Sequence, residues 1–319
     1  MLSAIAAAYK PAPFAPPIAA SRRGGGMTRR PAALLLASLL SGAPAAAAPR
    51  PVKVHGHRGS RGTMPENTLA AFAEALRVGV DVLELDMAVT KDDIVIVSHN
   101  PEVSPELCLD ASGGKLAAPV PFRSLTLAQV KGYDCGSLPN PRFPEQVRVP
   151  GERMPTLDEV FALVALSTYP AAATALFNIE TKLAPGFPEL SPDPERFVAL
   201  VAAIVEKHGL AARTILQSFD DRTLSAMKKR LPKVRTALLT SDNHFDFVAA
   251  ARAIGAGMLS PDRHWLTKDD VSRLHKAGIE VHPWTVNDEA GWAQMLALGV
   301  DGIITDYPEK LIAYLKKRP

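Results

Sequence analysis

Two hydrophobic patterns alternate along the chain from about residue 52 to its end. Short β-prone runs are followed by stretches in which apolar residues recur at the spacing of one helical face. The β-prone runs are residues 52–57, 80–88, 174–180, 214–217, 235–239, 258–259, 279–283 and 302–305. The helical patterns begin near residues 68 and 156 and then cover residues 195–208, 221–231, 245–254, 268–277, 289–298 and 308–316.

Eight strands that are each followed by a helix predict an α/β fold with a closed parallel sheet. Such repeats are typical of the (β/α)8 TIM barrel, and a chain of 319 residues is long enough to form one. Active sites in this barrel lie at the C-terminal ends of the strands. Polar residues at those strand ends are therefore the candidates for function.

The alternation is interrupted after the second strand. A short strand is predicted at residues 94–98, and residues 100–155 then form a stretch rich in proline and glycine that contains Cys108 and Cys135. We interpret residues 100–155 as an insertion that caps one face of the barrel, and residues 49–319 as a single barrel domain that includes it. The helical pattern resumes behind a capping-box sequence that begins at Thr156.

The first 48 residues are predicted to be a leader and a signal peptide rather than part of the fold. Residues 27–30 supply positive charge, residues 32–40 an apolar run, and residues 45–48 a cleavage zone of small side chains. We therefore expect a periplasmic or secreted protein. No later stretch approaches the about 20 apolar residues of a membrane helix, so no transmembrane segment is expected in the mature chain. Residues 1–26 are either a low-complexity leader or an over-long start.

Charge and cysteine content narrow the choice of partners and compartment. The formal net charge of +3 includes five positive residues within the first 48, where no acidic residue occurs, so the remainder carries −2. Nucleic acid is therefore not an expected partner. In an oxidising compartment the two cysteines can form a disulfide, whereas two buried thiols are the alternative. A disulfide would hold together an insertion that has few apolar residues of its own.

Acidic and apolar residues alternate along the second predicted strand. Glu84 and Asp86 point to one face of this strand, and Leu83 and Leu85 point to the other. Neighbouring carboxylates repel each other unless a cation lies between them, so the pattern predicts a divalent metal ion, either Ca²⁺ or Mg²⁺, which prefers oxygen ligands. A solvated pair on an exposed strand is the alternative, although the strands of a parallel barrel have no open face.

A second pair of charged residues ends the next barrel strand. Glu180 and Lys182 share one face of it. Glu180 can complete a site of three carboxylates, and Lys182 can place positive charge near a phosphate. A simple Glu–Lys pair is the alternative.

Two histidines follow strands near the same rim. His57 and Arg58 come at the end of the first strand, and His99 follows the short strand. An imidazole can move a proton while a guanidinium holds an anionic oxygen. Two imidazoles, an arginine and a metal ion suit in-line displacement at phosphorus. One histidine would accept the proton of the attacking oxygen, and the other would protonate the leaving alkoxide.

These residues, in this order along the chain, resemble the glycerophosphodiester phosphodiesterase family. The motifs that carry the resemblance are His57-Arg58-Gly59, Pro65-Glu66-Asn67-Thr68, Glu84-Leu85-Asp86, Ser98-His99, Glu180-Thr181-Lys182 and Trp284-Thr285-Val286-Asn287. They cover the chain from about residue 54 to residue 307. The resemblance implies a TIM barrel that cleaves a small-molecule glycerophosphodiester to glycerol 3-phosphate and an alcohol.

The resemblance also implies a role for each candidate residue. The implied roles are catalysis for His57 and His99, metal binding for Glu84, Asp86 and Glu180, and substrate binding for Arg58, Glu66, Lys182 and Trp284. Trp284 would line the pocket near the glycerol group, and a core aromatic is the alternative for it.

One position departs from the family pattern. Asn100 stands where the family commonly has an aspartate after the second histidine, which puts the basicity of His99 in question. Asn100 is also the one feature that favours a catalytically silent barrel that binds lipid head groups. A further alternative is an amidohydrolase-type zinc site, because His55 and His57 form an H-x-H pair, but the strands predicted at residues 235–239 and 258–259 supply no further histidine.

Overall fold

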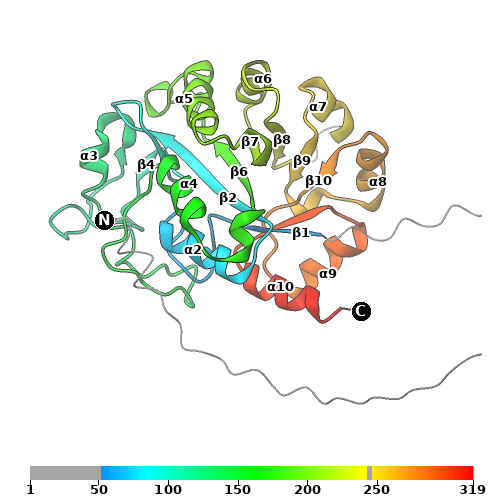
Figure 1. Ribbon diagram of the computed structural model, residues 1–319, viewed down its shortest axis with the longest axis horizontal. Helices are drawn as coiled ribbons and strands as arrows, with labels where there is room; N and C mark the ends of the chain where they lie inside the picture. The colour runs from blue at the N-terminus through cyan, green and yellow to red at the C-terminus, as the bar shows by residue number, and fades with distance from the viewer. Residues whose placement is uncertain (1–51, 243–245, 319) are drawn as a thin grey trace, which may run out of the picture. The chain divides into compact units, whose positions relative to one another are not determined.

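The computed structural model describes residues 52–242 and 246–318. The predicted leader and signal peptide lie outside these residues. Eight parallel strands lie side by side in the order β11, β1, β2, β6, β7, β8, β9 and β10, and helices surround them on the outside (Figure 1). The predicted TIM barrel is confirmed.

Each parallel strand is followed by one outer helix, as the alternation of patterns predicted. The strands are β1 (Lys53–Gly56), β2 (Val82–Val89), β6 (Leu176–Thr181), β7 (Thr214–Ser218), β8 (Arg235–Thr240), β9 (Met258–Pro261), β10 (Glu280–Val281) and β11 (Gly302–Thr305). The helices are α2 (Leu69–Val78), α4 (Leu157–Leu166), α5 (Pro194–Lys207), α6 (Asp221–Arg230), α7 (Phe247–Ala253), α8 (Lys268–Lys276), α9 (Glu289–Leu298) and α10 (Pro308–Lys316). None of the helices in the described part of the chain is long and apolar enough to cross a membrane.

Backbone hydrogen bonds between the last two strands close the sheet. The amide of Asp301 donates to the carbonyl of Val281 at 3.0 Å, and the amide of Ile304 donates to the carbonyl of Pro283 at 3.0 Å. The strand β10 itself ends at Val281 and is shorter than the predicted run of residues 279–283. The physical reason is Pro283, which has no N–H group with which to continue a regular ladder.

The alternation of side chains in β2 separates the core from the site. Leu83, Leu85 and Met87 are fully buried in the apolar cluster that packs against the outer helices. Glu84 and Asp86 take the intervening positions and therefore face the barrel interior. Burial of each large apolar side chain contributes about 1.5–3 kcal/mol, and a slip of one residue would turn the carboxylates into the core. The register of the metal-binding candidates is thus fixed by their apolar neighbours.

Local signals start the helices where the sequence predicts them. The Thr68 hydroxyl caps α2 by accepting a hydrogen bond from the amide of Ala71 at 3.2 Å. Gly79 ends this helix with φ of 93°, a conformation that glycine adopts without strain. Thr156 and Glu159 form the predicted capping box at the start of α4.

The insertion lies beyond the C-terminal end of β2 (Figure 1). The strand β3 (Val95–Val97) first turns back along β2 in antiparallel pairing. The chain then forms the short hairpin of β4 (Glu102–Val103) and β5 (Val120–Pro121), followed by the helix α3 (Leu127–Val130). Cys108 and Cys135 are joined by a disulfide with an S–S distance of 2.11 Å. We call residues 100–155 the cap.

The cap has more of an apolar core than we expected. Val103, Phe122 and Val130 are fully buried and pack with Ile96 and Met154 at the junction with the barrel. The predicted disulfide is present, but the expectation that the segment has few apolar residues of its own is wrong. These apolar residues stand singly in a proline-rich sequence without a helical or strand period, so the sequence pattern did not reveal that they meet.

Candidate active site

The candidate residues come from strand ends on the C-terminal rim of the barrel. His57 follows β1, Glu84 and Asp86 lie in β2, His99 follows β3, and Glu180 and Lys182 lie at the end of β6. Parallel strands bring these positions to one face, and this is the face at which TIM barrels carry their active sites.

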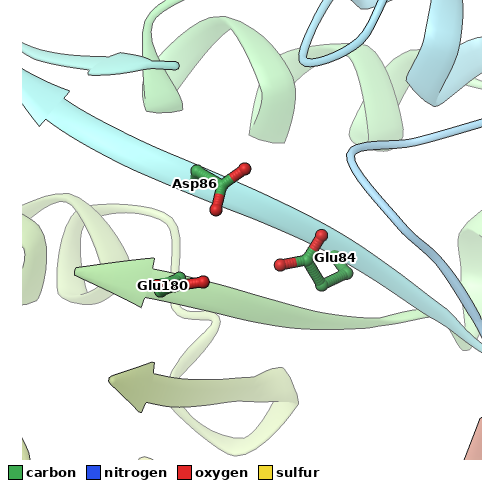
Figure 2. Close-up of side chains that lie close together, drawn as sticks. All are labelled: Glu84, Asp86 and Glu180. Atoms are coloured by element: carbon green, nitrogen blue, oxygen red, sulfur yellow. The ribbon is translucent and has the colours of Figure 1, made fainter. Parts of the chain in front are cut away.

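Glu84, Asp86 and Glu180 form a buried carboxylate cluster. The strands β2 and β6 are parallel neighbours, and their register places Asp86 beside Glu180 (Figure 2). One oxygen of each carboxylate lies within 4.8 Å of an oxygen of the other two. Among the residues that the structure describes, this is the one group of three or more potential ligands close enough to hold a metal ion.

Lys182 neutralises part of this cluster. Its Nζ lies 2.6 Å from Glu180 Oε1 and 3.1 Å from Asp86 Oδ1. The Glu–Lys contact that we considered as an alternative is thus present, but it extends to Asp86. Burial would raise the pKa of Asp86, yet Lys182 and Arg58 hold that pKa well below its usual value. Burial outweighs Lys182 at Glu180 and raises the pKa of Glu180 to about 7.

Glu84 lacks a comparable cation. It accepts hydrogen bonds from Gln217 Nε2 at 2.7 Å and from the backbone amide of Arg58 at 2.8 Å, and both donors are neutral. Burial together with the charges of Asp86 and Glu180 raises the pKa of Glu84 well above its usual value. If all three carboxyls were ionised, the cluster would carry more negative charge than its neighbours neutralise, and the raised pKa values of Glu84 and Glu180 express this cost. A divalent cation that prefers oxygen ligands, Ca²⁺ or Mg²⁺, fits this donor set.

His57 is held by a carboxylate that follows the last strand. Its Nδ1 lies 2.6 Å from Asp306 Oδ1, and Asp306 Oδ2 accepts a hydrogen bond from Asn287 Nδ2 at 2.7 Å. Burial would raise the pKa of Asp306, but His57 and Arg61 hold it at about 2, so Asp306 is ionised and can only accept. The neutral imidazole therefore carries its proton on Nδ1, and Nε2 is left as a proton acceptor.

Arg58 and Glu66 form an ion pair beside the carboxylate cluster. Arg58 Nη1 donates to Glu66 Oε1 at 2.6 Å, and Arg58 Nε lies 3.3 Å from Asp86 Oδ2. Arg61 Nε lies 3.0 Å from the other oxygen of Glu66. Arg58 has φ of 51° and Asn67 has φ of 57°, an uncommon conformation for residues other than glycine. Strained backbone of this kind is typical of functional loops.

His99 lies on the cap side of the carboxylates. Its Nδ1 donates to Asn100 Oδ1 at 2.8 Å, which is a contact to a neutral amide. Burial lowers the pKa of His99 to about 4, against the opposite effect of Asp86. Asn100 therefore orients the imidazole without supplying the negative charge that would raise its pKa.

Trp284 is half-buried on the loop after β10 and is not a core residue. Its Nε1 donates to the carbonyl of Ser260 at 2.8 Å. Its ring meets the ring of Phe219, which follows β7, edge to face with 5.7 Å between centroids. Phe219 is about half exposed. The pair forms an aromatic surface on the rim, and the proposed contact of Trp284 with glycerol stays a prediction.

His55 does not share a metal site with His57. It is fully buried, and its Nε2 lies 2.8 Å from Nδ1 of His282, which is also fully buried. His282 Nε2 lies 3.1 Å from Glu280 at the start of β10. The two histidines of the H-x-H pair therefore have different partners: His55 contacts His282 in the barrel interior, and His57 contacts Asp306 at the rim. This arrangement does not support an amidohydrolase-type zinc site.

Several residues that shape the site were given no role in it from the sequence, although two of them, Asn67 and Asn287, lie in the motifs that carry the family resemblance. They are Arg61, Asn67, Asn178, Gln217, Asn287 and Asp306. Asp306 could have been found, because an acidic residue directly after the last barrel strand lies on the active face. Gln217 and Asn178 could not have been found, because an amide side chain within a strand does not indicate a site until its neighbours in space are known.

Comparison with known proteins identifies the group to which this fold and site belong. The model of the glycerophosphoryl diester phosphodiesterase family matches residues 57–310, which is most of the chain. The chain belongs to this family. A glycerophosphodiester phosphodiesterase from Caldanaerobacter subterraneus is 33% identical over 265 residues, which are 82% of this chain and 96% of that protein. A glycerophosphodiester phosphodiesterase from Bacillus subtilis is 30% identical over 79% of this chain and 83% of its own.

Solved structures of this phosphodiesterase family share the fold. A crystal structure from Silicibacter pomeroyi, assigned to the glycerophosphoryl diester phosphodiesterases, is 31% identical and superposes with a TM-score of 0.78. It covers 84% of this chain and 94% of its own. A phosphodiesterase from Oleispira antarctica, solved in complex with the product sn-glycerol-3-phosphate, is 22% identical with a TM-score of 0.68, over 83% of this chain and 97% of its own.

Proposed function

We propose that the protein hydrolyses glycerophosphodiesters to glycerol 3-phosphate and an alcohol. The observation that carries this proposal is the convergence of two imidazoles, one arginine and three buried carboxylates on the active face of a barrel from the phosphodiesterase family. The relatives named for this activity support it, as does the Oleispira antarctica protein that binds sn-glycerol-3-phosphate.

The residues divide the chemistry among themselves. His57 Nε2, with Nδ1 fixed by Asp306, accepts the proton of the attacking oxygen. His99 returns a proton to the leaving alkoxide, once the anionic diester beside it has raised its pKa. Arg58 and Lys182 supply positive charge at the phosphoryl oxygens.

Glu84, Asp86 and Glu180 would hold the divalent ion. A bound ion of this kind stabilises negative charge on phosphoryl oxygens. The proximity of the three carboxyls and the raised pKa values of Glu84 and Glu180, which show that their ionisation lacks a compensating cation, support the proposal that the protein requires such an ion, either Ca²⁺ or Mg²⁺. Without it, any ionised carboxylate of the cluster would repel an anionic substrate.

We also propose that the protein is exported to the periplasm or secreted. The signal-like sequence of residues 27–48 supports this. The Cys108–Cys135 disulfide supports it as well, because disulfides persist in oxidising compartments. Cell fractionation and determination of the mature N-terminus test the proposal, and a cytosolic protein that retains residue 30 would contradict it.

The test of the activity is a coupled assay of released glycerol 3-phosphate. We expect turnover to be lost after treatment with EDTA and desalting, and to return when Ca²⁺ or Mg²⁺ is added. His57→Ala and His99→Ala should each lower kcat by about 10²- to 10⁴-fold, which is the usual scale for loss of a positioned proton donor or acceptor. His275→Ala, on the outer helix α8, is the matched control. Full activity without a metal ion, or in either active-site variant, would contradict the proposal.

A further inference from the structure

A pocket lies between the rim of the barrel and the cap. Its empty space, counted together with the open solvent at its mouth, is about 570 Å³. On the barrel side it is lined by Glu66, Asn67 and His99, and on the cap side by residues that include Glu102, Asn140 and the two disulfide cysteines. The pocket is therefore continuous with the site and lies on the side of His99, the residue assigned to the leaving alkoxide.

The charges that line this pocket are acidic. Glu66 is neutralised by Arg58 and Arg61. Glu102 is only partly buried, and no described residue forms an ion pair or side-chain hydrogen bond with its carboxylate. Within the described chain, no lysine or arginine lines the pocket. An occupant with a positive charge would therefore find a carboxylate without a competing partner.

Asn140 provides a second, independent sign of a ligand. The residue is only 7% exposed, and its Oδ1 accepts a hydrogen bond from the amide of Arg142 at 3.1 Å. This contact identifies Nδ2 as the remaining donor, and Nδ2 has no acceptor among the described residues. A buried donor without an acceptor costs about 1–3 kcal/mol, so an oxygen of a bound molecule at this place would be stabilised.

We infer that this pocket binds the alcohol portion of the diester and selects alcohols that carry a primary ammonium group, such as ethanolamine. The inference rests on the function proposed above and specifies its substrate. The ammonium group lies toward Glu102, and the Asn140 amide donates to an oxygen at the phosphate end of the alcohol.

The walls of the pocket distinguish a primary from a quaternary ammonium group. Proteins recognise quaternary groups with the rings of Trp, Tyr and Phe, and none of these residues in the described chain lines this pocket. A primary ammonium group can instead donate three hydrogen bonds to carboxylate and amide oxygens. Ethanolamine is therefore favoured over choline, and both are favoured over the uncharged inositol.

The wild-type protein tests this inference with a substrate panel. Release of glycerol 3-phosphate is measured from the ethanolamine, choline, inositol and glycerol diesters of sn-glycerol 3-phosphate. We expect the highest kcat/KM for the ethanolamine diester, and the neutral glycerol diester controls for size. Equal kcat/KM values, or a preference for inositol, would overturn the inference while leaving the proposed function intact. The absence of product from every diester would instead overturn the proposed function.

A matched pair of variants tests the role of Glu102. Glu102→Gln should lower kcat/KM for the ethanolamine diester about fivefold, which is the scale of a partly exposed ion pair. Its kcat/KM for the glycerol diester should stay within about twofold of the wild-type value. Glu106→Gln removes an exposed carboxylate from the same part of the cap and should change neither value. An equal loss for both diesters in Glu102→Gln would show a structural effect and would contradict selection by charge.

Discussion

Asp306 determines which nitrogen of His57 carries the proton. The 2.6 Å contact to Nδ1 and the ionised state of Asp306 leave Nε2 as an acceptor. Asp306 does not need to touch the substrate to have this effect, so we regard it as a positioning residue. The hydrogen bond from Asn287 holds Asp306 in place in turn.

Replacement of Asp306 by asparagine should alter the pH profile as well as the rate. The negative charge of Asp306 and its hydrogen bond to Nδ1 raise the pKa of His57 against the effect of burial, so their loss should lower both the pKa and the basicity of His57. We expect kcat/KM to fall by about 10- to 100-fold and its acidic limb to move to lower pH. A merely structural role would lower the rate without moving that limb, which a pH–rate measurement on well-folded protein distinguishes.

Asn100→Asp should shift the pH–rate profile to higher pH, through His99 rather than His57. The 2.8 Å contact to His99 would then come from a carboxylate, which raises the pKa of His99 from its lowered value. If His99 is the acid, the alkaline limb of kcat should move to higher pH by about one unit or more. An unchanged profile would show that the amide and the carboxylate are equivalent at this position.

At the scale of elements, the cap is tied to the barrel in two ways. The disulfide closes a loop across a sequence separation of 27, and a small apolar cluster around Phe122 joins the cap to the end of β2 and to β3. The barrel has separate and larger apolar clusters of its own. Local opening of the cap therefore does not require unfolding of the barrel.

Removal of the disulfide should loosen the cap more than the barrel. For a loop of this length the chain-entropy estimate is about 3–4 kcal/mol, and the apolar cluster around Phe122 would retain part of the order. The double variant Cys108→Ser/Cys135→Ser should raise KM for the diesters and speed hydrogen exchange in residues 100–155. Exchange in β1 and β6 should stay close to that of the wild type. Accelerated exchange throughout the barrel, or an unchanged KM, would contradict a role confined to the mouth of the site.

At the scale of the whole molecule, the fold was more predictable than the details of the site. The alternating patterns identified the barrel strands because each buries an apolar face, and the spacing in β2 placed Glu84 and Asp86 on one side. The contacts of Asp306 with His57 and of Gln217 with Glu84 join residues 249 and 133 positions apart. No periodicity encodes such distant side-chain contacts, so these partners required the structure.

The barrel interior also contains a histidine pair that should make stability depend on pH. Burial lowers the pKa of His55 and of His282, so both are neutral in the folded protein. Their neighbours are the carboxylates of Glu280 and Asp301, which favour protonation of His282, and the cations Lys53 and Arg235, which oppose protonation of His55.

Because both pKa values are lower in the folded than in the unfolded protein, acid should destabilise the fold. Below about pH 6.5 the unfolded chain binds protons that the folded protein excludes, so the free energy of unfolding falls with pH by up to about 1.4 kcal/mol per unit for each histidine. In chemical unfolding, the free energy of unfolding of His282→Gln should fall less between pH 6.5 and pH 5 than that of the wild type. The exposed control His264→Gln should follow the wild type. This window lies above the range in which Glu280, with its pKa of about 2, contributes. If the free energy of unfolding of His282→Gln depended on pH as steeply as that of the wild type, the idea that the fold excludes protons from His55 and His282 would be wrong. Loss of the contact between the two rings alone would lower the free energy of unfolding equally at pH 6.5 and at pH 5.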